Sequence, residues 1–561
     1  MRTVGYLFPI LLLLSAPALA QPDDGKRPNG MTEKEYQQKK AEIKARIDRL
    51  ETEYARYAAD ATGFEGVWRV SGSRTYSRRG GDKLQVQDYE GELWITREDG
   101  DFVVEGKVRL KGRNSGKWEG AGALDGDALE EDYESTVGGK GTARYTLKPD
   151  GSLEIAWASE QRGGPTKPEA KGQGTAVRAL PIAREELEKQ LFEANHELQF
   201  LRYPRPEPTK YESRSGNFEM RFTPTVEYDP NGVENYVIGL IGQATKTIDL
   251  CVFEFSLPRV ARALVKANKE RGVRVRMVFD DREEEQEAVK ILHDNGIEAK
   301  SDQRSAYMHN KFMVIDAEDA DKALVWTGST NISPGGIYVA DNHSLLFKNQ
   351  TVAKTYTTEF EEMFVDGSFG PKSPQNTSHD WVRIDQYTKV QVYFAPEDGA
   401  MDRLIEAVRS AKKSIKIIAF AFTSTKLFQA VTERMKDGVK VEAIFESRHA
   451  GWKDIKIGPL NAAGATVRFD VNPDALHHKV IVIDEKLVCT GSFNFSDSAD
   501  RENDENMLVL DGRAAARAFV RELDALMSTT DPSDPRIATS GMPDKNDRDG
   551  IMDMLKGLNG N

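Results

Sequence analysis

Hydrophobic and polar positions repeat along the C-terminal part of the chain. The apolar pattern from Phe218 to Phe364 recurs from Val390 to Met527, with a Phe-x-Pro, a strand-like run and a Gly-Val-x-Val in each copy. Each copy predicts the order strand, strand, helix, strand, helix, strand, with a last helix that closes it. We therefore predict two similar α/β halves, residues 217–369 and 388–530, each a mixed sheet flanked by helices. A polar linker, 370–387, joins them.

A different pattern fills residues 64–180. Short runs of alternating apolar residues, such as Leu93-Trp94-Ile95-Thr96, are separated by Asp-Gly pairs that are typical of tight turns. This pattern predicts an all-β domain, an antiparallel meander or barrel. A barrel could bind a lipid or cell-wall ligand, but the tryptophans of this segment are more simply explained as core.

Helical periodicity flanks this β domain on both sides. Within residues 21–63, Thr32 and Glu35 predict a capping box at the start of an amphipathic helix, and a second apolar stripe follows in residues 181–216. Each stripe is too short for an independent coiled coil, so packing of the two helices on each other is favoured over packing on another chain. Oligomerisation through these helices stays open as the alternative.

The two ends of the chain differ from the rest. Residues 1–20 combine Arg2, an apolar run and small residues before Gln21, which predicts a cleaved signal peptide and a secreted or periplasmic protein. No later stretch is apolar enough to predict a membrane span. The tail, 531–561, is polar and predicted to be flexible. Its segment Asp547–Gly550 is similar to part of a calcium loop but lacks the glutamate expected at the last position, so a solvated tail is favoured.

Composition narrows the classes of function. The chain has 561 residues and a formal net charge of −13, which disfavours a nuclease that relies on a broad basic surface. Its length is ample for several separate cores. The two cysteines, Cys251 and Cys489, lie in apolar runs, so buried thiols are a better expectation than a disulfide, although an exported protein could form one.

The motif His-x-Lys-x4-Asp occurs twice, at 309–316 and 477–484, and each copy is followed by Gly-Ser-x-Asn, at 328–331 and 491–494. Each lysine begins an apolar run that predicts a strand. Histidine and lysine then project from one face, whereas the aspartate and His478 point elsewhere. The candidate site residues are His309, Lys311, Ser329, Asn331, His477, Lys479, Ser492 and Asn494, with Asp316 and Asp484 in structural roles.

These residue types suit the cleavage of a phosphodiester. Two ammonium groups and several neutral donors can stabilise the non-bridging oxygens of a phosphoryl group, which is the role that magnesium has in other enzymes. One imidazole can attack phosphorus while the other protonates the leaving oxygen. The set lacks a cysteine–histidine array and a dense carboxylate cluster beside the histidines, so we predict no metal and no other cofactor.

At these residues the chain resembles the phospholipase D superfamily. The second copy, ending at Asn503-Asp504-Glu505-Asn506, is similar to the small bacterial endonucleases of that superfamily, and the first copy is similar to its generic bacterial members. The resemblance implies a site between two similar halves, a phosphohistidine at His309, and His477 as the acid and then the base. It also implies that Glu505 orients its histidine, and we place Asp341 at the corresponding position of the first half.

We therefore expect a secreted phosphodiesterase of the phospholipase D type that hydrolyses a phospholipid head-group ester. The usual activity of the family, the predicted export and the acidic charge favour a lipid substrate. One alternative is an extracellular, metal-independent endonuclease that binds nucleic acid. Another is a lipid- or wall-binding surface protein with inactive hydrolase halves, against which the intact motifs argue.

Overall fold

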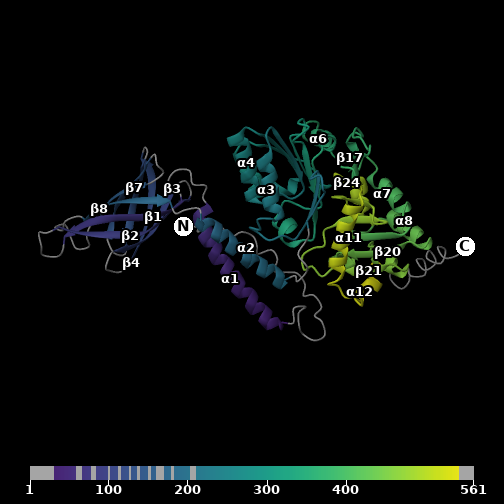
Figure 1. Cartoon of the computed structure of the whole chain (residues 1–561), viewed down its shortest axis with the longest axis horizontal. Coiled ribbons are helices and arrows are strands. Elements are labelled where there is room, and N and C mark those ends of the chain that lie inside the picture. The colour runs from purple at the N-terminus through teal and green to yellow at the C-terminus, as the bar shows by residue number, and fades with distance from the viewer. Residues whose placement is uncertain are drawn as a thin grey trace. The chain divides into compact units, whose positions relative to one another are not determined.

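The described residues divide between two compact units, one within 32–198 and the other within 199–542. The structure is a computed structural model (Figure 1). It describes residues 31–58, 66–77, 84–98, 101–110, 115–125, 128–135, 139–148, 153–159, 170–178, 182–202 and 210–542. The predicted signal peptide and the calcium-loop-like segment at 547–550 lie outside the described residues.

A closed antiparallel β-barrel makes up most of the N-terminal unit. Consecutive strands pair with each other, and β1 also pairs with β8, so the described strands form a closed sheet. Its interior contains buried side chains such as Trp68, Leu93 and Tyr145. The predicted all-β domain is thus a barrel. Its strands are β1 (Gly66–Ser77), β2 (Leu84–Glu98), β3 (Asp101–Leu110), β4 (Ser115–Asp125), β5 (Ala128–Ser135), β6 (Gly139–Leu147), β7 (Leu153–Ser159) and β8 (Ala170–Arg178).

The two helices of this unit are α1 (Glu33–Ala58) and α2 (Ile182–Arg202). The predicted capping box starts α1. Thr32 N donates a hydrogen bond to Glu35 Oε2 at 2.8 Å, and Glu35 N donates to Thr32 Oγ1 at 3.3 Å. Two orphan N–H groups at the start of the helix are therefore satisfied, as the sequence predicted.

The helices α1 and α2 lie against each other within the N-terminal unit. Lys39 Nζ is 3.3 Å from Glu197 Oε1, and the stripe residues Ile43 and Leu191 are buried. The expected packing inside one chain is confirmed. Association between chains through these helices remains a prediction.

The C-terminal unit contains two eight-stranded mixed sheets with the same strand order. From edge to edge the first is β13-β12-β11-β14-β15-β16-β10-β9 and the second is β21-β20-β19-β22-β23-β24-β18-β17. Strands β11, β12 and β13 are parallel, as are β19, β20 and β21, and the other pairs are antiparallel. The predicted duplication is therefore a structural repeat.

The strands of the first sheet are β9 (Tyr211–Glu212), β10 (Phe218–Phe222), β11 (Thr247–Val252), β12 (Arg274–Phe279), β13 (Glu298–Ser301), β14 (Lys311–Ile315), β15 (Leu324–Gly328) and β16 (His343–Phe347). Those of the second are β17 (Val382–Arg383), β18 (Lys389–Ala395), β19 (Ser414–Ala419), β20 (Lys440–Phe445), β21 (Thr466–Phe469), β22 (Lys479–Ile483), β23 (Leu487–Gly491) and β24 (Glu505–Asp511).

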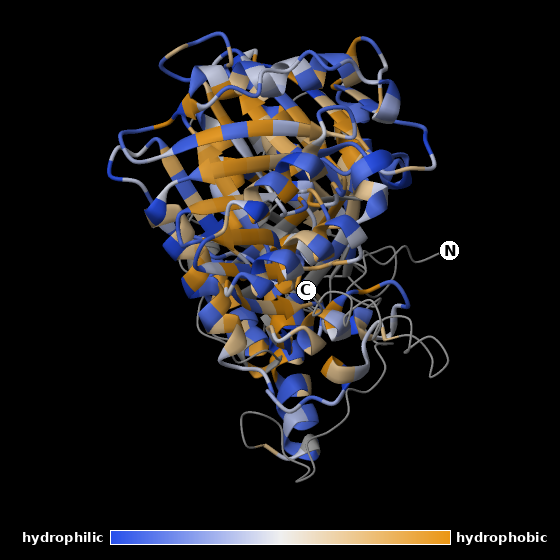
Figure 2. Cartoon of the chain, turned by 90° about the vertical axis from the view of Figure 1, so that its right-hand side faces the viewer, coloured by the Kyte–Doolittle hydropathy of each residue, from blue (hydrophilic) through white to orange (hydrophobic). Residues whose placement is uncertain are grey.

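Helices cover each sheet in the same sequence order. The first half has α3 (Val233–Gln243), α4 (Pro258–Arg271), α5 (Glu287–Asp294) and α6 (Gln350–Phe364). The second half has α7 (Ala400–Arg409), α8 (Thr425–Lys436), α9 (Ile457–Ala462), α10 (Asp497–Arg501) and α11 (Arg513–Met527), and α12 (Arg536–Thr539) follows. Figure 2 shows the strands largely apolar and the surrounding loops polar.

Three local features differ from the predicted order. Helices α3 and α7 each follow the first long strand of their half, where the sequence pattern had suggested a second strand. Within the predicted linker, β17 pairs with β18 at the sheet edge. Within the predicted tail, α12 buries Ile537 against the second half, so the chain is structured through Met542. In β17 and α12, packing against the second half decides the structure of segments whose composition is polar.

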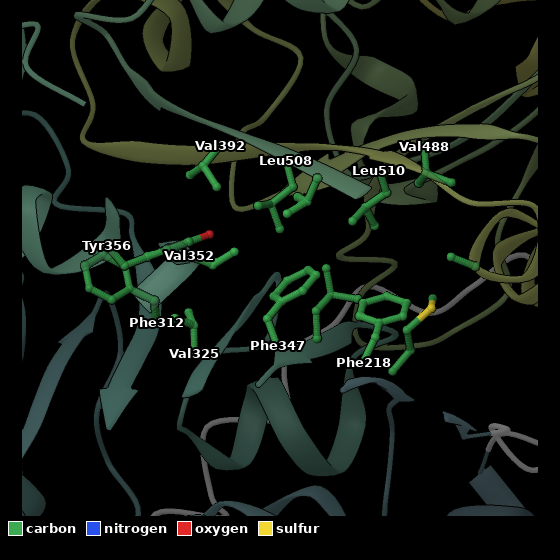
Figure 3. Close-up of a cluster of buried hydrophobic side chains, with 14 of the residues drawn as sticks. Phe218, Phe312, Val325, Phe347, Val352, Tyr356, Val392, Val488, Leu508 and Leu510 are labelled. Atoms are coloured by element: carbon green, nitrogen blue, oxygen red, sulfur yellow. The ribbon is translucent and has the colours of Figure 1, made fainter. Parts of the chain in front are cut away.

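A shared hydrophobic core joins the halves. Phe218 and Phe347 of the first sheet lie opposite Leu508 and Leu510 of the second (Figure 3). The closing helix α6 adds Tyr356, and α11 also contributes to the same core. Separate outer cores lie between each sheet and its other helices. Because both halves bury residues in one cluster, neither can be removed without exposing the other.

Cys251 and Cys489 are buried free thiols, as predicted. Among the described helices, none has the length and apolarity needed to cross a membrane.

Phe347 tests the shared core. This side chain is fully buried and stacks on Phe218 with ring centroids 5.1 Å apart. Phe347→Ala should lower the free energy of unfolding by about 3–5 kcal/mol because it leaves a cavity. Urea denaturation measures the change. Val365→Ala, at a site 62% exposed, should change it by less than about 0.5 kcal/mol, and equal effects of the two substitutions would contradict the proposed core.

Candidate active site

The two histidine motifs meet where the halves join. Lys311 is the first residue of β14 and Lys479 the first of β22, so His309 and His477 each lie two residues before the start of equivalent strands. The imidazole ring centroids are 6.4 Å apart. The site is therefore built from both copies, as the duplicated motif predicted.

Each histidine is oriented by a side chain from the other half. His309 Nδ1 lies 2.7 Å from Glu505 Oε2, and His477 Nδ1 lies 2.8 Å from Asn342 Oδ1. In both rings this leaves Nε2 for a substrate. The arrangement is symmetric in position but unequal in charge, since one partner is a carboxyl group and the other a neutral amide.

The structure corrects the position of Asp341. Phe222 pairs with His343, as Phe394 pairs with Asn506, so the residue equivalent to Glu505 is Asn342 and not Asp341. The side chain of Asp341 instead accepts a hydrogen bond from Asn472 Nδ2 at 2.9 Å. The sequence contained the signal, because Asn342 and Glu505 follow the glycine of their Gly-Ser-x-Asn at the same spacing.

The two lysines are held in place by the histidines' own backbone. Lys311 Nζ donates to His309 O at 2.6 Å, and Lys479 Nζ donates to His477 O at 2.7 Å. Each ammonium also lies over an aromatic ring, Phe253 at 4.9 Å and Phe420 at 4.8 Å from the ring centroids. Sequence reasoning missed these two phenylalanines, although they occupy equivalent positions in the repeat.

Burial governs the charges in the site. Burial lowers the pKa of Lys311 to about 8, although nearby carboxylates, chiefly Glu505, oppose this shift. Burial, and after it the positive charge of Lys311, lowers the pKa of Lys479 well below its ordinary value. Burial and the two lysines also lower the pKa of His309 well below its ordinary range, and His477 is affected in the same way. The side chains of Lys311 and Lys479 therefore favour the neutral form of both imidazoles.

Glu505 differs from an ordinary surface carboxylate. Burial raises its pKa to about 8, although Lys311 opposes this rise. Its short contact with His309 Nδ1 therefore holds a proton between two groups that both resist charge when buried. An anionic substrate between the lysines would make their charges easier to maintain.

The serines of the Gly-Ser-x-Asn sequences bond to an orienting residue or to the residue next to it. Ser329 Oγ donates to Asn342 Oδ1 at 2.8 Å, and Asn506 N donates to Ser492 Oγ at 2.9 Å. We had expected the serine hydroxyls to converge on a phosphate. Both serines are instead fully buried, and their hydroxyls position neighbouring residues. Asn331 and Asn494 each retain a buried Oδ1 without a hydrogen-bond partner among the described residues.

The glycine of this sequence is required by space. Gly328 and Gly491 both have φ of +140°. A Cβ on Gly328 would lie 2.4 Å from His343 O, and one on Gly491 would lie 2.3 Å from Asn506 O. Each glycine thus lets two strands approach closely beside a serine that bonds to an orienting residue or to its neighbour.

The motif aspartates occupy the structural positions predicted for them. Asp316 accepts backbone hydrogen bonds from Thr245, Lys246 and Thr247 at 2.7–2.8 Å. Asp484 accepts the equivalent bonds from residues 412–414. These bonds lower the pKa of both carboxyl groups and fix the far end of each histidine-bearing strand to the start of the neighbouring strand.

His478 lies away from the catalytic face, as strand alternation predicted. It is fully buried and stacks on His343, with ring centroids 5.2 Å apart and the two Nδ1 atoms 2.9 Å apart. Its Nε2 is 3.4 Å from Glu522 Oε1. Ser329 Oγ, which supports Asn342, is 3.2 Å from His343 Nδ1, so a buried polar chain connects this pair to the support of His477.

Aromatic residues from loops lie beside the site. Tyr307 is 43% exposed and its ring centroid is 6.5 Å from that of His309. On the other side Trp452, 46% exposed, stacks on His449 at 3.6 Å, and His449 contacts Phe420 at 4.4 Å. The sequence analysis gave these residues no role, because nothing in a loop's local pattern shows that it lies next to the motif.

Comparisons with known proteins agree with this architecture. The model of the cardiolipin synthase, PLD-like domain matches residues 237–364 and 404–527. The chain is 30% identical over 151 residues to a phospholipase D of Rickettsia prowazekii, covering 27% of this chain and 74% of that protein. The chain therefore belongs to the phospholipase D family, a family of phosphodiester hydrolases.

Other relatives match shorter shares. Mitochondrial cardiolipin hydrolase of Xenopus tropicalis is 34% identical over 136 residues, which are 24% of this chain and 65% of that protein, so the match spans just under two thirds of its length. Among solved structures, Nuc from Salmonella typhimurium, a phospholipase D family member, is 31% identical with a TM-score of 0.25, covering 26% of this chain and 97% of that one.

Proposed function

We propose that this protein is a secreted or periplasmic phosphodiesterase that hydrolyses phospholipid head-group esters through a phosphohistidine. One observation carries the proposal. Two imidazoles with lowered pKa values come from different halves and lie with their ring centroids 6.4 Å apart, and a buried lysine lies beside each. A phosphoryl group placed between them would meet a nucleophile on one side and a proton donor on the other. Export is proposed from residues 1–20 of the sequence.

The reaction follows from the free ring nitrogens. His309 Nε2 attacks phosphorus, the bond from phosphorus to the leaving oxygen breaks, and His477 Nε2 gives its proton to that oxygen. In the second step His477 takes a proton from water, the water oxygen bonds to phosphorus, and the bond to His309 breaks. The ammonium groups of Lys311 and Lys479 stabilise the phosphoryl oxygens throughout, so no metal is needed for these steps.

The unequal orienting residues favour this assignment of roles. An imidazole that bonds to phosphorus becomes cationic, and the Glu505 carboxylate can stabilise that charge on His309. Asn342 is neutral and adds no such stabilisation to protonated His477. His477 is therefore the readier proton donor once the negative charge of a bound phosphodiester offsets the repulsion by the lysines.

A lipid substrate is favoured over nucleic acid. The net charge of −13 opposes binding to an extended polyanion. Exposed Tyr307 and Trp452 beside the site could lie at the boundary between lipid head groups and water, where amphipathic rings are stable. Because aromatic rings also stack on bases, an endonuclease is the second candidate.

Parallel assays test the substrate. The full chain should release head group from phosphatidylcholine vesicles and leave single-stranded DNA intact, and His309→Ala should lose at least about 1,000-fold in kcat because the nucleophile is absent. Rapid DNA cleavage without lipid turnover, also lost in His309→Ala, would favour the endonuclease. Inactivity of the folded chain on both substrates would favour the binding-protein alternative.

A substrate with a good leaving group tests the two histidine roles. With bis(p-nitrophenyl) phosphate, His477→Ala should give a burst of p-nitrophenol because a phenolate leaves without protonation, and then stop because no base activates water. Mass spectrometry of quenched protein should find the phosphoryl adduct on the peptide that contains His309. The matched variant His309→Ala should give neither burst nor adduct, and an adduct at His477 in that variant would reverse the roles.

The pH dependence tests the charge on Lys311. Since the pKa of Lys311 is about 8, its ammonium is present below that pH and is lost above it. kcat/KM should therefore fall as pH rises through about 8, while the lowered pKa of His309 keeps the nucleophile neutral below pH 7. Initial rates with bis(p-nitrophenyl) phosphate from pH 5 to 10 measure this. A rate that stays level to pH 10 would exclude a required ammonium with this pKa.

A further inference from the structure

A second group of ionisable residues lies outside the histidine site. Glu359 and Glu362 project from α6 of the first half, and Glu397 follows β18 of the second half. One carboxylate oxygen from each lies within 4.8 Å of the others. The first two side chains are buried and the third is half-buried. This acidic cluster therefore joins the two halves at a place that the mechanism does not use.

Among the described residues, no basic side chain forms an ion pair with Glu359, Glu362 or Glu397, although buried carboxylates are normally paired with cations. Glu359 is only 2% exposed, and its Oε2 has no hydrogen-bond partner among the described residues. Its neighbours are more carboxylates, including Asp398 and Asp504. Two nearby basic side chains are engaged with other carboxylates: Arg304 pairs with Asp504 at 2.7 Å, and His379 lies 3.5 Å from Asp398.

Burial and mutual repulsion disfavour ionisation here. Burial, followed by repulsion from Glu397, raises the pKa of Glu359 well above its ordinary value. Burial raises the pKa of Glu362 to about 7 and that of Glu397 to about 8. A group of buried carboxylates needs either bound protons or a bound cation to be stable.

The repeat provides an internal comparison. The position in α11 that corresponds to Glu359 is Glu522, and its Oε1 lies 3.4 Å from an imidazole nitrogen of His478. The counterparts of Glu362 and Glu397 are Ala525 and Thr225, which carry no charge. The group of three carboxylates therefore has no equivalent at the corresponding positions of the repeat, where the single glutamate, Glu522, faces a histidine. Fold alone does not require them.

We propose that Glu359, Glu362 and Glu397 bind a calcium ion that ties α6 of the first half to the loop after β18 in the second. Carboxylate oxygens are the ligands that hard divalent cations prefer. Three carboxylates can supply up to six oxygens if each binds through both, and Ca²⁺ accepts six to eight in irregular geometry. Histidine and cysteine, which would favour zinc, are absent from this trio.

The surroundings of the trio explain what the ion would do. Asp398, next to Glu397, accepts hydrogen bonds from Thr377 Oγ1 at 2.7 Å and Phe394 N at 2.9 Å, so part of the linker between the halves is fixed to this loop. None of the three ligands contacts His309, His477 or their lysines. The ion would therefore stabilise the union of the halves and leave phosphoryl chemistry to the histidine site.

Thermal unfolding of the full chain tests the proposal. Protein treated with EDTA and freed of chelator should gain about 3–5 °C in Tm on addition of millimolar CaCl₂ at pH 8, with less effect from MgCl₂. Titration calorimetry should show one saturable site. The gain should shrink at pH 5.5, because protons compete with the metal for the carboxylates.

Matched variants separate this site from general charge effects. Glu359→Gln/Glu362→Gln should raise the Tm of the calcium-free protein, since it removes unpaired buried carboxylates, and should abolish the gain with calcium. Glu361→Gln, on the same helix but paired with Arg276, should keep that gain. If calcium gives neither heat nor a Tm change in the unsubstituted protein, while Tm falls as pH rises from 5 to 8, the cluster is protonated and the proposal is wrong. Equal gains in all three proteins would also overturn it.

Discussion

Two short backbone contacts between the halves determine the geometry of the active site. His309 N donates to Asp504 O at 2.9 Å, and His477 N donates to Asp341 O at 2.8 Å. Each contact fixes a histidine beside the start of a strand in the other half, so the residue that follows the aspartate, Glu505 or Asn342, meets the imidazole. Since side chains alternate along a strand, a shift of one residue would remove that partner and present an aspartate that already serves elsewhere.

The shared hydrophobic core holds the two halves at the separation that these backbone contacts require. Phe347 and Leu508 come from opposite sheets but belong to one buried cluster, so the distance between the sheets is fixed by close packing and not by the few polar atoms of the site. The buried lysines then have stable surroundings although their charges repel. Hydrophobic packing is in this way the source of an electrostatic arrangement that would not form in water.

Much of this could be predicted from sequence because it depends on local periodicity. Strand alternation separated His309 and Lys311 from Asp316, and the capping residues at Thr32 identified the start of a helix. The role of Asn342 was missed because it depends on register between distant strands, although equal spacing after the glycines could have revealed it. Glu359 gave no signal at all: a glutamate on a helix predicts a solvated face, and sequence does not show what covers that face.

The inequality of Glu505 and Asn342 has a consequence for the direction of substrate binding. If two identical copies formed the site, a phosphodiester could enter in either of two opposite orientations, with either of its ester oxygens beside either histidine. Here a single chain carries both copies, and each has its own orienting residue. The proposed roles of the two histidines then make one orientation chemically preferred: the departing alcohol would leave on the His477 side, towards Phe420 and the His449–Trp452 stack. Because both copies belong to one chain, the two sides of the site are not equivalent. The loops on one side can therefore adapt to the group that is released, and those on the other side to the group that is retained.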